Sequence, residues 1–431
     1  MKKVVLDTNI VLNDPSVVLR EDISIVLPYT VLAELDKLKR DNELRFVAQL
    51  AIKNIKKSYV DGKISIIDIP NELTTNDEKI VNSAKKENAS IWTDDVGASI
   101  IAMANGVDLY LDEESNVEYD EKYTGYSEWI VPAQIYYDLL NKENQYQIPE
   151  IEEFTDVRAV VNEYVKIAPD DGSLNYRLFR KRSNDYIFVS ESKKLFSALG
   201  NVSGSGDKHG LGFEFLHPEQ AMAFDAVFNS DTPLAVITGE IGSGKTLIST
   251  VAALARTAGT HTNKKYERIL VTRPNRPISK DYEIGFLPGD ADAKLKSWLS
   301  GFTSNLEFLY ERNLKDIEEE KASQVFSKYF KSVPIESVQG ASFHNCIFLI
   351  DEAQLLDALA LKQIMSRLAD TSKCVLIMDP KQTYGMNRGR EGYRRLLPRC
   401  KGNELISFVK LQHIQRSPLT KLVNSIFEDV R

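Results

Sequence analysis

A glycine-rich segment near the middle of the chain has the residue types and spacing that bind the phosphates of a nucleotide. It fits the pattern G-x-x-x-x-G-K-S/T and lies between an apolar run, LAVIT, and a run without glycine or proline, LISTVAALA. Glycines let successive backbone N–H groups point at a phosphate, the lysine reaches the β and γ oxygens, and the threonine hydroxyl can hold Mg²⁺. We therefore predict a strand, a nucleotide-binding loop and a helix, with the loop formed by Gly239, Glu240, Ile241, Gly242, Ser243, Gly244, Lys245 and Thr246.

A second apolar segment, IFLIDE at residues 347–352, ends in two acids and complements this loop. At the carboxyl end of a parallel strand, Asp351 would be placed to bind Mg²⁺ and Glu352 to polarise an attacking water. Taken alone, the pair could equally be surface acids after a strand. A further strand, CVLIMDPKQ, ends in Asp379 and reaches Gln382, which could sense the γ-phosphate or simply form a helix cap and turn.

Four carboxylates in the N-terminal part follow predicted strands or begin predicted helices. They are Asp7 in LDTN, Glu34 in VLAELDKLK, Asp77 in DEKIVNSA and Asp95 in SIWTDD. Strand ends, and the helix starts beyond them, gather at one edge of a parallel sheet. We therefore expect the four to converge, although each alone would be interpreted as a surface residue or a helix cap.

Converging carboxylates repel one another, and each raises the pKa of its neighbours unless cations neutralise them. Mg²⁺ or Mn²⁺ is the simplest neutralising group, because hard cations prefer oxygen ligands. Two such ions could activate a water molecule and stabilise the leaving oxygen of a phosphodiester. The sequence thus predicts a divalent-metal site made of Asp7, Glu34, Asp77 and Asp95.

Three regions of different pattern position these residues. Over residues 1–125, short β-branched runs alternate with longer amphipathic runs, of which the longest is 31–60 and the last short one is DLYL; this predicts a parallel α/β sheet. Residues 126–205 contain one helical candidate, PAQIYYDLLNKEN, and hairpin-like strands, and we interpret them as a small β-rich connecting module. The βα alternation returns over 206–431, so the fold class is α/β with a C-terminal P-loop NTPase domain.

Composition places the chain among globular proteins. Hydrophobic residues make up 43% and charged residues 27%, which excludes the disordered, collagenous and disulfide-framework classes. Three cysteines without C-x-x-C spacing argue against a zinc site and indicate a reducing, cytoplasmic setting. Neither a signal-peptide region nor a run of about 18 apolar residues is found, so we expect no membrane passage.

The net charge of −8 is unevenly distributed along the chain. Residues 1–125 carry 15 basic against 23 acidic side chains, 126–205 carry 9 against 12, and 206–431 carry 30 against 27. An acidic N-terminal part joined to a mildly basic C-terminal part can conceal a local basic surface. The charge therefore permits a nucleic-acid partner without predicting one.

The C-terminal motifs, taken in order, resemble the PhoH-like ATPases, relatives of superfamily 1 helicases. The order is HPEQ, the phosphate loop, TRP, IGFLPGD, LIDEAQ, DPKQ and QRSPL, and the resemblance covers residues 206–431. It implies a RecA-like domain that uses ATP with Mg²⁺, acts on RNA and forms a homo-oligomer, a hexameric ring. The basic stretch that the family has before the second acidic motif reads ESVQGASF here, so no RNA contact is assigned to that loop.

The same resemblance assigns roles to residues outside the phosphate loop. Gln220 would recognise the adenine edge, and Arg416 would be the arginine finger. Arg273 and Arg276 would lie near nucleic acid or phosphate. Simpler alternatives are an exposed first-turn residue for Gln220, a surface arginine before proline for Arg273, and a helix cap for Arg416.

The N-terminal motifs resemble the PIN-domain ribonucleases over residues 1–112, and the order PIN then PhoH resembles a known fused family. LDTN, VLAELDKLK, D-x-x-I and the acid pair before a helix carry this likeness. It implies a metal-dependent ribonuclease site, with Thr8 and Asn9 ordering it through hydrogen bonds. Asp94 is the alternative to Asp95, which we prefer because it is last on its predicted strand.

These expectations predict two hydrolases in one chain. The leading hypothesis is an ATP-dependent RNA helicase or translocase coupled to a metal-dependent endoribonuclease. The alternative is an ATP-gated RNA-binding or remodelling factor whose PIN domain is an inactive docking module, and the four retained acids favour the first. A kinase is disfavoured, because an acid pair after the strand suits water activation better than transfer to a hydroxyl.

Overall fold

The computed structural model describes most of the chain, in two compact units. The described ranges are 1–41, 44–68, 75–110, 122–141, 158–183, 185–189, 215–258, 265–274, 300–313, 327–338, 340–382 and 392–414, with the single residues 152, 155 and 426. The first unit covers Met1–Glu118, and the second takes in most of the chain from Tyr119 onward. Of the helices in these ranges, none combines the length and the apolar character that crossing a membrane requires.

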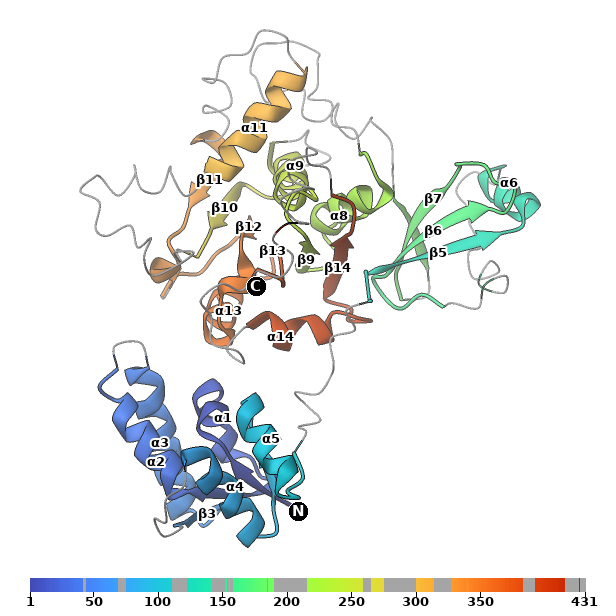
Figure 1. Ribbon diagram of the computed structural model, residues 1–431. Coiled ribbons are helices and arrows are strands. Elements are labelled where there is room, and N and C mark those ends of the chain that lie inside the picture. Colours follow the sequence, from blue (N-terminus) through green and yellow to red (C-terminus); the bar gives the residue numbers. More distant parts are fainter. Residues whose placement is uncertain are drawn as a thin grey trace. The chain divides into compact units, whose positions relative to one another are not determined.

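The first unit, drawn in blue shades in Figure 1, contains a parallel four-stranded sheet; its strand order is β3-β2-β1-β4. Its strands are β1 (Lys2–Leu6), β2 (Ile23–Pro28), β3 (Ile64–Ile67) and β4 (Ser90–Trp92). Its helices are α1 (Thr8–Asn13), α2 (Tyr29–Leu38), α3 (Arg45–Val60), α4 (Asn76–Lys86) and α5 (Val96–Ala104). Buried aliphatic side chains of the strands and helices share one core, which confirms the predicted parallel α/β arrangement.

Three details of this unit differ from the sequence prediction. The long amphipathic run is divided into α2 and α3, because the Asp41 carboxylate accepts a hydrogen bond from Leu44 N (2.9 Å) and turns the chain between them. The described part of DLYL forms only an isolated β-bridge, through Leu109. Asp95 is not the last residue of a strand, because β4 ends earlier and Asp95 is the N-cap of α5.

The second unit is organised around a six-stranded parallel sheet of order β11-β10-β12-β13-β9-β14. Its strands are β9 (Leu234–Gly239), β10 (Arg268–Thr272), β11 (Phe330–Ser332), β12 (Cys346–Ile350), β13 (Lys373–Met378) and β14 (Ile406–Leu411). Its helices include α8 (Pro218–Phe228), α9 (Lys245–Ala258), α11 (Ser300–Asn313), α13 (Ala358–Met365) and α14 (Gly392–Leu396).

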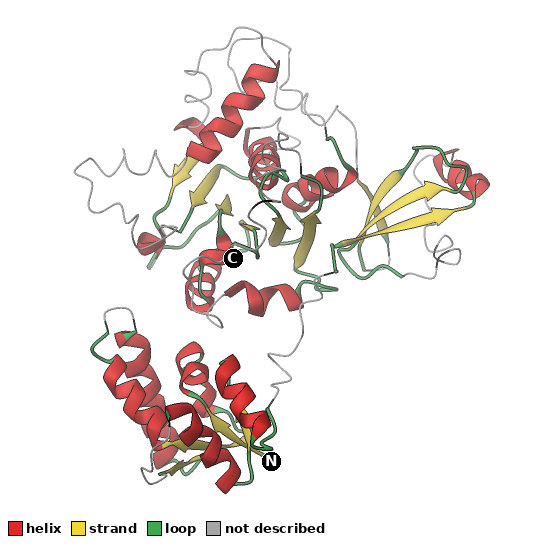
Figure 2. Ribbon diagram, viewed as in Figure 1, coloured by secondary structure: helices red, strands yellow, loops and turns green. Residues whose placement is uncertain are grey.

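Helices cover both faces of the six-stranded sheet (Figure 2). Alternate strand residues such as Ile237 and Leu349 pack against α8, α9 and α11, whereas their neighbours Val236 and Phe348 pack against α13 and α14. Strands buried on both faces read as continuous apolar runs, which is why the central strands could be predicted from sequence. Their carboxyl ends lie at one edge, where the candidate nucleotide site is found.

A second, smaller sheet of the same unit has the order β5-β6-β7-β8. Its elements are β5 (Tyr126–Val131), α6 (Ala133–Asn141), β6 (Tyr164–Pro169), β7 (Arg177–Lys181) and β8 (Tyr186–Val189). β5 and β6 are parallel, whereas β7 and β8 form an antiparallel hairpin. One face packs against α6 through Trp129 and Tyr136, and Tyr164 and Leu178 on the other face join the core that contains α8.

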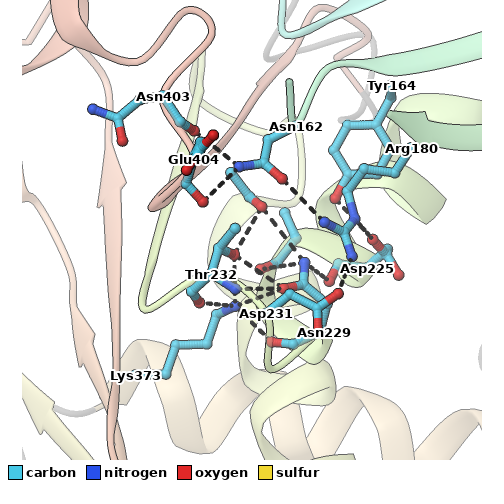
Figure 3. Close-up of polar contacts among 12 residues, drawn as sticks. Asn162, Tyr164, Arg180, Asp225, Asn229, Asp231, Thr232, Lys373, Asn403 and Glu404 are labelled. Atoms are coloured by element: carbon cyan, nitrogen blue, oxygen red, sulfur yellow. Dashed lines mark hydrogen bonds and ion pairs between the residues drawn. The ribbon is translucent and has the colours of Figure 1, made fainter. Parts of the chain in front are cut away.

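A buried polar joint fixes this sheet to α8 (Figure 3). Arg180 of β7 is only 2% exposed and donates hydrogen bonds to Asp225 (3.2 Å), Asp231 (2.9 Å) and Asn162 (3.1 Å). Tyr164 of β6 donates to the same Asp225 carboxylate at 2.9 Å. A buried guanidinium needs this many partners to offset its lost hydration, so the joint determines how the β5–β8 sheet sits on α8.

Lys373, the first residue of β13, contacts the turn next to this joint. Its ammonium is fully buried and donates to the carbonyl oxygens of Asn229 (2.7 Å) and Thr232 (2.8 Å), which close the turn between α8 and β9. Burial lowers the pKa of Lys373 to about 7, although Asp225 opposes the shift. Lys373 therefore ties the end of α8 to the central sheet.

The joint predicts that Arg180→Ala destabilises the second unit. The substitution leaves Asp225, Asp231 and Asn162 short of a donor, and we expect a loss of about 2–4 kcal/mol in the free energy of unfolding. Urea unfolding followed by the fluorescence of the buried Trp129 measures the change. Arg177→Ala on the same strand is the matched control, because its described hydrogen bond is to the Tyr176 carbonyl; equal losses in both variants would contradict the prediction.

Candidate functional site

The phosphate loop joins β9 to α9 and needs glycine at three positions. Gly239, Gly242 and Gly244 have φ angles of +149°, +85° and +90°. A Cβ on Gly239 would also lie 2.6 Å from the carbonyl oxygen of Leu411. Only glycine adopts this conformation at low cost, and it lets backbone N–H groups turn toward an anion. The strand, loop and helix follow one another as the sequence predicts.

Lys245 and Thr246 begin α9 beside this loop. The Lys245 ammonium donates to the carbonyl oxygens of Gly239 (2.6 Å) and Glu240 (2.8 Å), which holds its charge over the loop. The Thr246 hydroxyl lies 3.4 Å from Oδ1 of Asp351, the residue directly after β12. In the sheet, β13 lies between β12 and β9, the strand that leads to Thr246. A hydroxyl and a carboxylate at this separation are suited to share one Mg²⁺.

Asp351 is a buried carboxylate at the end of β12. Its pKa is raised to about 6, first by burial and then by the charge of the neighbouring Glu352, while the charges of Arg273 and Lys245 oppose the shift. Keeping such a group ionised costs free energy unless a cation compensates. The donor set therefore fits a divalent ion held between Asp351 and Thr246.

Glu352 adopts a left-handed backbone conformation, with φ +52° and ψ +38°. Its carboxylate accepts hydrogen bonds from Arg273 (3.2 Å) and from Gln354 (2.6 Å), so its direction is fixed. A non-glycine residue in this conformation is strained, and such strain concentrates at functional sites. Arg273 is thus paired with an acid of the site and is not an isolated surface arginine.

Gln354 is a functional residue that the sequence analysis gave no role. It is fully buried, donates to Glu352 and to the Gln382 carbonyl (3.3 Å), and accepts from Asp379 N (3.1 Å). Gln382 in turn donates to the Asp379 carboxylate at 2.6 Å. Gln354 thus links the ends of β12 and β13, and its place two residues after Glu352 in DEAQ is the one local hint that the sequence offers.

Gln220 lies in the first turn of α8 and is 5% exposed, unlike an ordinary first-turn residue. Its Oε1 accepts a hydrogen bond from Leu216 N (2.9 Å), and its Nε2 lies 3.6 Å from the position that a Cβ on Gly244 would take. The amide therefore adjoins the phosphate loop. Arg276, Arg416 and the segment GFLPGD lie outside the described residues.

In the first unit, Asp7 is the buried N-cap of α1. Its pKa is raised to about 6, chiefly by burial and to a smaller extent by the charges of Asp77 and Glu34. Hydrogen bonds from the Thr93 hydroxyl and from Thr8 N (2.6 Å) oppose that shift. Thr93 was not singled out from sequence, although it directly precedes the acid pair.

The other three carboxylates surround Asp7 less tightly than expected. Glu34 accepts from the Thr8 hydroxyl and from Asn76 (2.6 Å). The pKa of Asp77 is raised by burial first, and then by the charges of Asp95 and Glu34. Within the described ranges, no three His, Cys, Asp or Glu side chains form a group that could hold a metal ion together. The Glu34 carboxylate is hydrogen-bonded to Thr8 and Asn76, and the Asp95 carboxylate caps α5. These bonds keep the two carboxylates apart from Asp7.

Asp94 and Asp95 have different neighbours. Asp94 accepts a hydrogen bond from Asn13 (3.0 Å), and its backbone N lies 3.5 Å from the Asn9 side-chain oxygen. The charge of Asp95 acts on Asp77 and raises its pKa. This favours Asp95 as the fourth carboxylate, for a different reason than its expected place on a strand.

Comparison with known proteins gives two family matches. A PIN domain matches residues 4–110, and a PhoH-like protein matches residues 214–428. Protein PhoH2 of Bacillus subtilis is 26% identical over 455 aligned positions, which cover 97% of this chain and 98% of that protein. Protein PhoH2 of Mycolicibacterium smegmatis is 28% identical, over 54% of this chain and 53% of its own length. Protein PhoH of Escherichia coli K12 is 29% identical, over 41% and 47%.

The two matches fall on the two units that carry the candidate sites. The carboxylates around Asp7 lie in the PIN match, and the phosphate loop with Asp351 and Glu352 lies in the PhoH-like match. The similarity to PhoH2 of Bacillus subtilis extends over both. The chain therefore belongs to the family in which a PIN domain is fused to a PhoH-like ATPase domain.

Proposed function

We propose that this chain is an ATP-dependent RNA helicase or translocase that carries a metal-dependent endoribonuclease. The observation that supports this best is the approach of Thr246 to Asp351 beside the strained Glu352. It combines phosphate binding, cation ligation and water activation at one sheet edge. The proposed boundaries are 1–125 for the nuclease, 126–205 for the connecting module and 206–431 for the ATPase.

In the ATPase, Lys245 neutralises the β- and γ-phosphates, and Thr246 and Asp351 would hold Mg²⁺, which would offset phosphate charge. Glu352 orients and polarises the attacking water, because Arg273 and Gln354 hold its carboxylate from two sides. Gln354 also carries the link to Gln382, so a change at the γ-phosphate can reach the ends of both strands.

In the nuclease, Asp7, Glu34, Asp77 and Asp95 would hold Mg²⁺ or Mn²⁺ once drawn together by the ion, which would supply activation of water and stabilisation of the leaving oxygen. The raised pKa of Asp7 fits this role, because a buried carboxylate beside like charges gains most from a cation. Thr8 and Thr93 orient Glu34 and Asp7 through their hydroxyls. RNA is the substrate proposed from the PIN match.

We further propose that the ATPase works as a homo-oligomeric ring, of six subunits, with Arg416 as the arginine finger. An arginine finger meets the charge that develops on the transferred phosphoryl group, and a neighbouring subunit can supply it. In the sequence, Arg416 lies shortly after β14, which pairs with the strand that leads into the phosphate loop.

The function predicts a defined pattern of ATP turnover and RNA cleavage. Labelled RNA incubated with the full chain should be cut only when Mg²⁺ or Mn²⁺ is present, and ATP should be hydrolysed with Mg²⁺. Phosphate release and gel analysis of the RNA, with and without ATP and with EDTA as the control, measure both reactions together. Cleavage that persists in EDTA, or no ATP turnover with Mg²⁺ and RNA, would contradict the proposal.

A second candidate function is an ATP-gated RNA-binding or remodelling factor with an inactive PIN domain. The looser arrangement of Glu34 and Asp95 within the described ranges favours it. The same assay separates the two functions, because this factor would hydrolyse ATP and leave the RNA intact.

A further inference from the structure

Glu219, the neighbour of Gln220 in α8, is a buried carboxylate that the proposed reaction does not use. It is 3% exposed, and its Oε1 accepts from the backbone N–H groups of Gln412 (3.1 Å) and His413 (2.7 Å). Nδ1 of His413 also lies 3.1 Å from this oxygen. Its other oxygen, Oε2, accepts from the Tyr126 hydroxyl at 3.0 Å. A buried carboxylate with this many donors holds its partners firmly.

Glu219 and its partners come from three separate elements. Tyr126 begins β5, Glu219 lies in the first turn of α8, and Gln412 and His413 follow β14. The Tyr126 hydroxyl also lies 2.8 Å from Oε1 of Gln412. Burial and the Glu219 charge raise the pKa of Tyr126, so its hydroxyl remains a proton donor. The Glu219 carboxylate thus holds the β5–β8 sheet, α8 and the end of β14 together.

This junction adjoins the nucleotide site. The last residue of β14, Leu411, pairs with Gly239, the first residue of the phosphate loop. Gln412 and His413 therefore leave the sheet beside that loop, and the Gln220 amide adjoins Gly244 of the same loop. The backbone N–H of Gln220 donates to the His217 carbonyl at 3.0 Å.

An imidazole pair lies at the same place. The rings of His217 and His413 stack with centroids 4.1 Å apart and an interplanar angle of 11°. Burial and the neighbouring His413 lower the pKa of His217, which favours the neutral ring. Flat rings beside a hydrogen-bonding amide are the surface on which planar bases are recognised.

We propose that Glu219 is a positioning residue for the purine base of the nucleotide. It holds Gln412 and His413 against the first turn of α8, so that the stacked imidazoles and the Gln220 amide form the wall that receives the base. Glu219 itself touches neither the base nor the phosphates. This inference rests on the proposed ATP binding and extends it to the selection between adenine and guanine.

The experiment compares Glu219→Ala with Glu219→Gln in the full chain. Alanine removes every acceptor, so we expect the Kd for mant-ATP and the KM for ATP to rise about tenfold and the preference for ATP over GTP to fall, with kcat within about twofold. Glutamine keeps one oxygen for the two backbone N–H groups and offers its amide to the Tyr126 oxygen, so near-parental values are expected. This split between KM and kcat distinguishes base positioning from general damage.

Arg180→Ala is the structural control. It loosens the opposite end of α8, where Arg180 binds Asp225, and it should lower stability without changing the ratio of the Kd values for mant-ATP and mant-GTP. Tyr126→Phe covers the case in which Glu219→Ala fails to fold. It removes the bond to Oε2 and the contact with Oε1 of Gln412 but keeps the backbone donors of Gln412 and His413, so a rise of about two- to threefold in the KM for ATP is expected.

Two results would overturn the inference. One is a folded Glu219→Ala protein with the parental Kd, KM and preference for ATP over GTP. The other is a Tyr126→Phe protein with parental values when Glu219→Ala does not fold. Failure of the proposed function is a distinct outcome, because the unsubstituted chain would then bind neither mant-ATP nor mant-GTP.

Discussion

Replacing Lys245 with alanine is expected to reduce ATP hydrolysis by roughly 10²–10³-fold and to weaken ATP binding. The ammonium is held over the phosphate loop by the carbonyls of Gly239 and Glu240. In loops of this pattern that charge meets the β and γ oxygens in both the ground state and the transition state, so binding and turnover should fall together. Phosphate release and mant-ATP titration measure the two effects separately.

Glu352→Gln is the contrasting variant. It should keep ATP binding and lose turnover, because the carboxylate acts when water attacks and the amide oxygen can still accept from Arg273. Lys362→Ala on α13 controls for the loss of an exposed lysine and should match the parent. Parental turnover in Lys245→Ala would refute the assignment of the nucleotide site.

Local patterns predicted most of the fold. The strand, loop and helix of residues 234–258 are contiguous, so their order could be predicted from one stretch of sequence. The division between α2 and α3 was missed, although Asp41 and its hydrogen bond to Leu44 N provide a local signal. The edge strands β11 and β14 were missed as well, because β11 has only three residues and both contain polar residues that interrupt the apolar run.

The candidate sites show the same limit. Asp351 could be placed near Thr246 because both lie at the carboxyl edge of a parallel sheet. Gln354 could not be given its role in this way, because its partners Asp379 and Gln382 come from the next strand and meet it only in the folded chain. Glu219 was not singled out from sequence either, because its partners Tyr126, Gln412 and His413 are also distant in the chain.

Asp7→Asn is expected to lower RNA cleavage by at least roughly 10–100-fold, the loss typical of removing even an outer partner of a metal site. Asp7 is the most buried of the four carboxylates, and the charges of Asp77 and Glu34 act on it. An amide in its place removes a negative oxygen ligand and keeps the acceptor for Thr93, so cation binding should fall more than stability. Cleavage of labelled RNA across a Mg²⁺ titration measures the effect.

ATP hydrolysis in the same Asp7→Asn protein should stay within about twofold of the parent, because the phosphate loop is in the other compact unit. Asp36→Asn is the matched control, since this exposed acid of α2 pairs with Lys39 at the surface. Asp95→Asn should also lose cleavage, whereas Asp94→Asn should retain most of it, because the charge of Asp95 acts on Asp77 while Asp94 accepts a hydrogen bond from Asn13. If Asp7→Asn cut RNA as fast as the parent, the PIN domain would be the docking module of the second candidate function, and the ATPase alone would carry the chemistry of the chain.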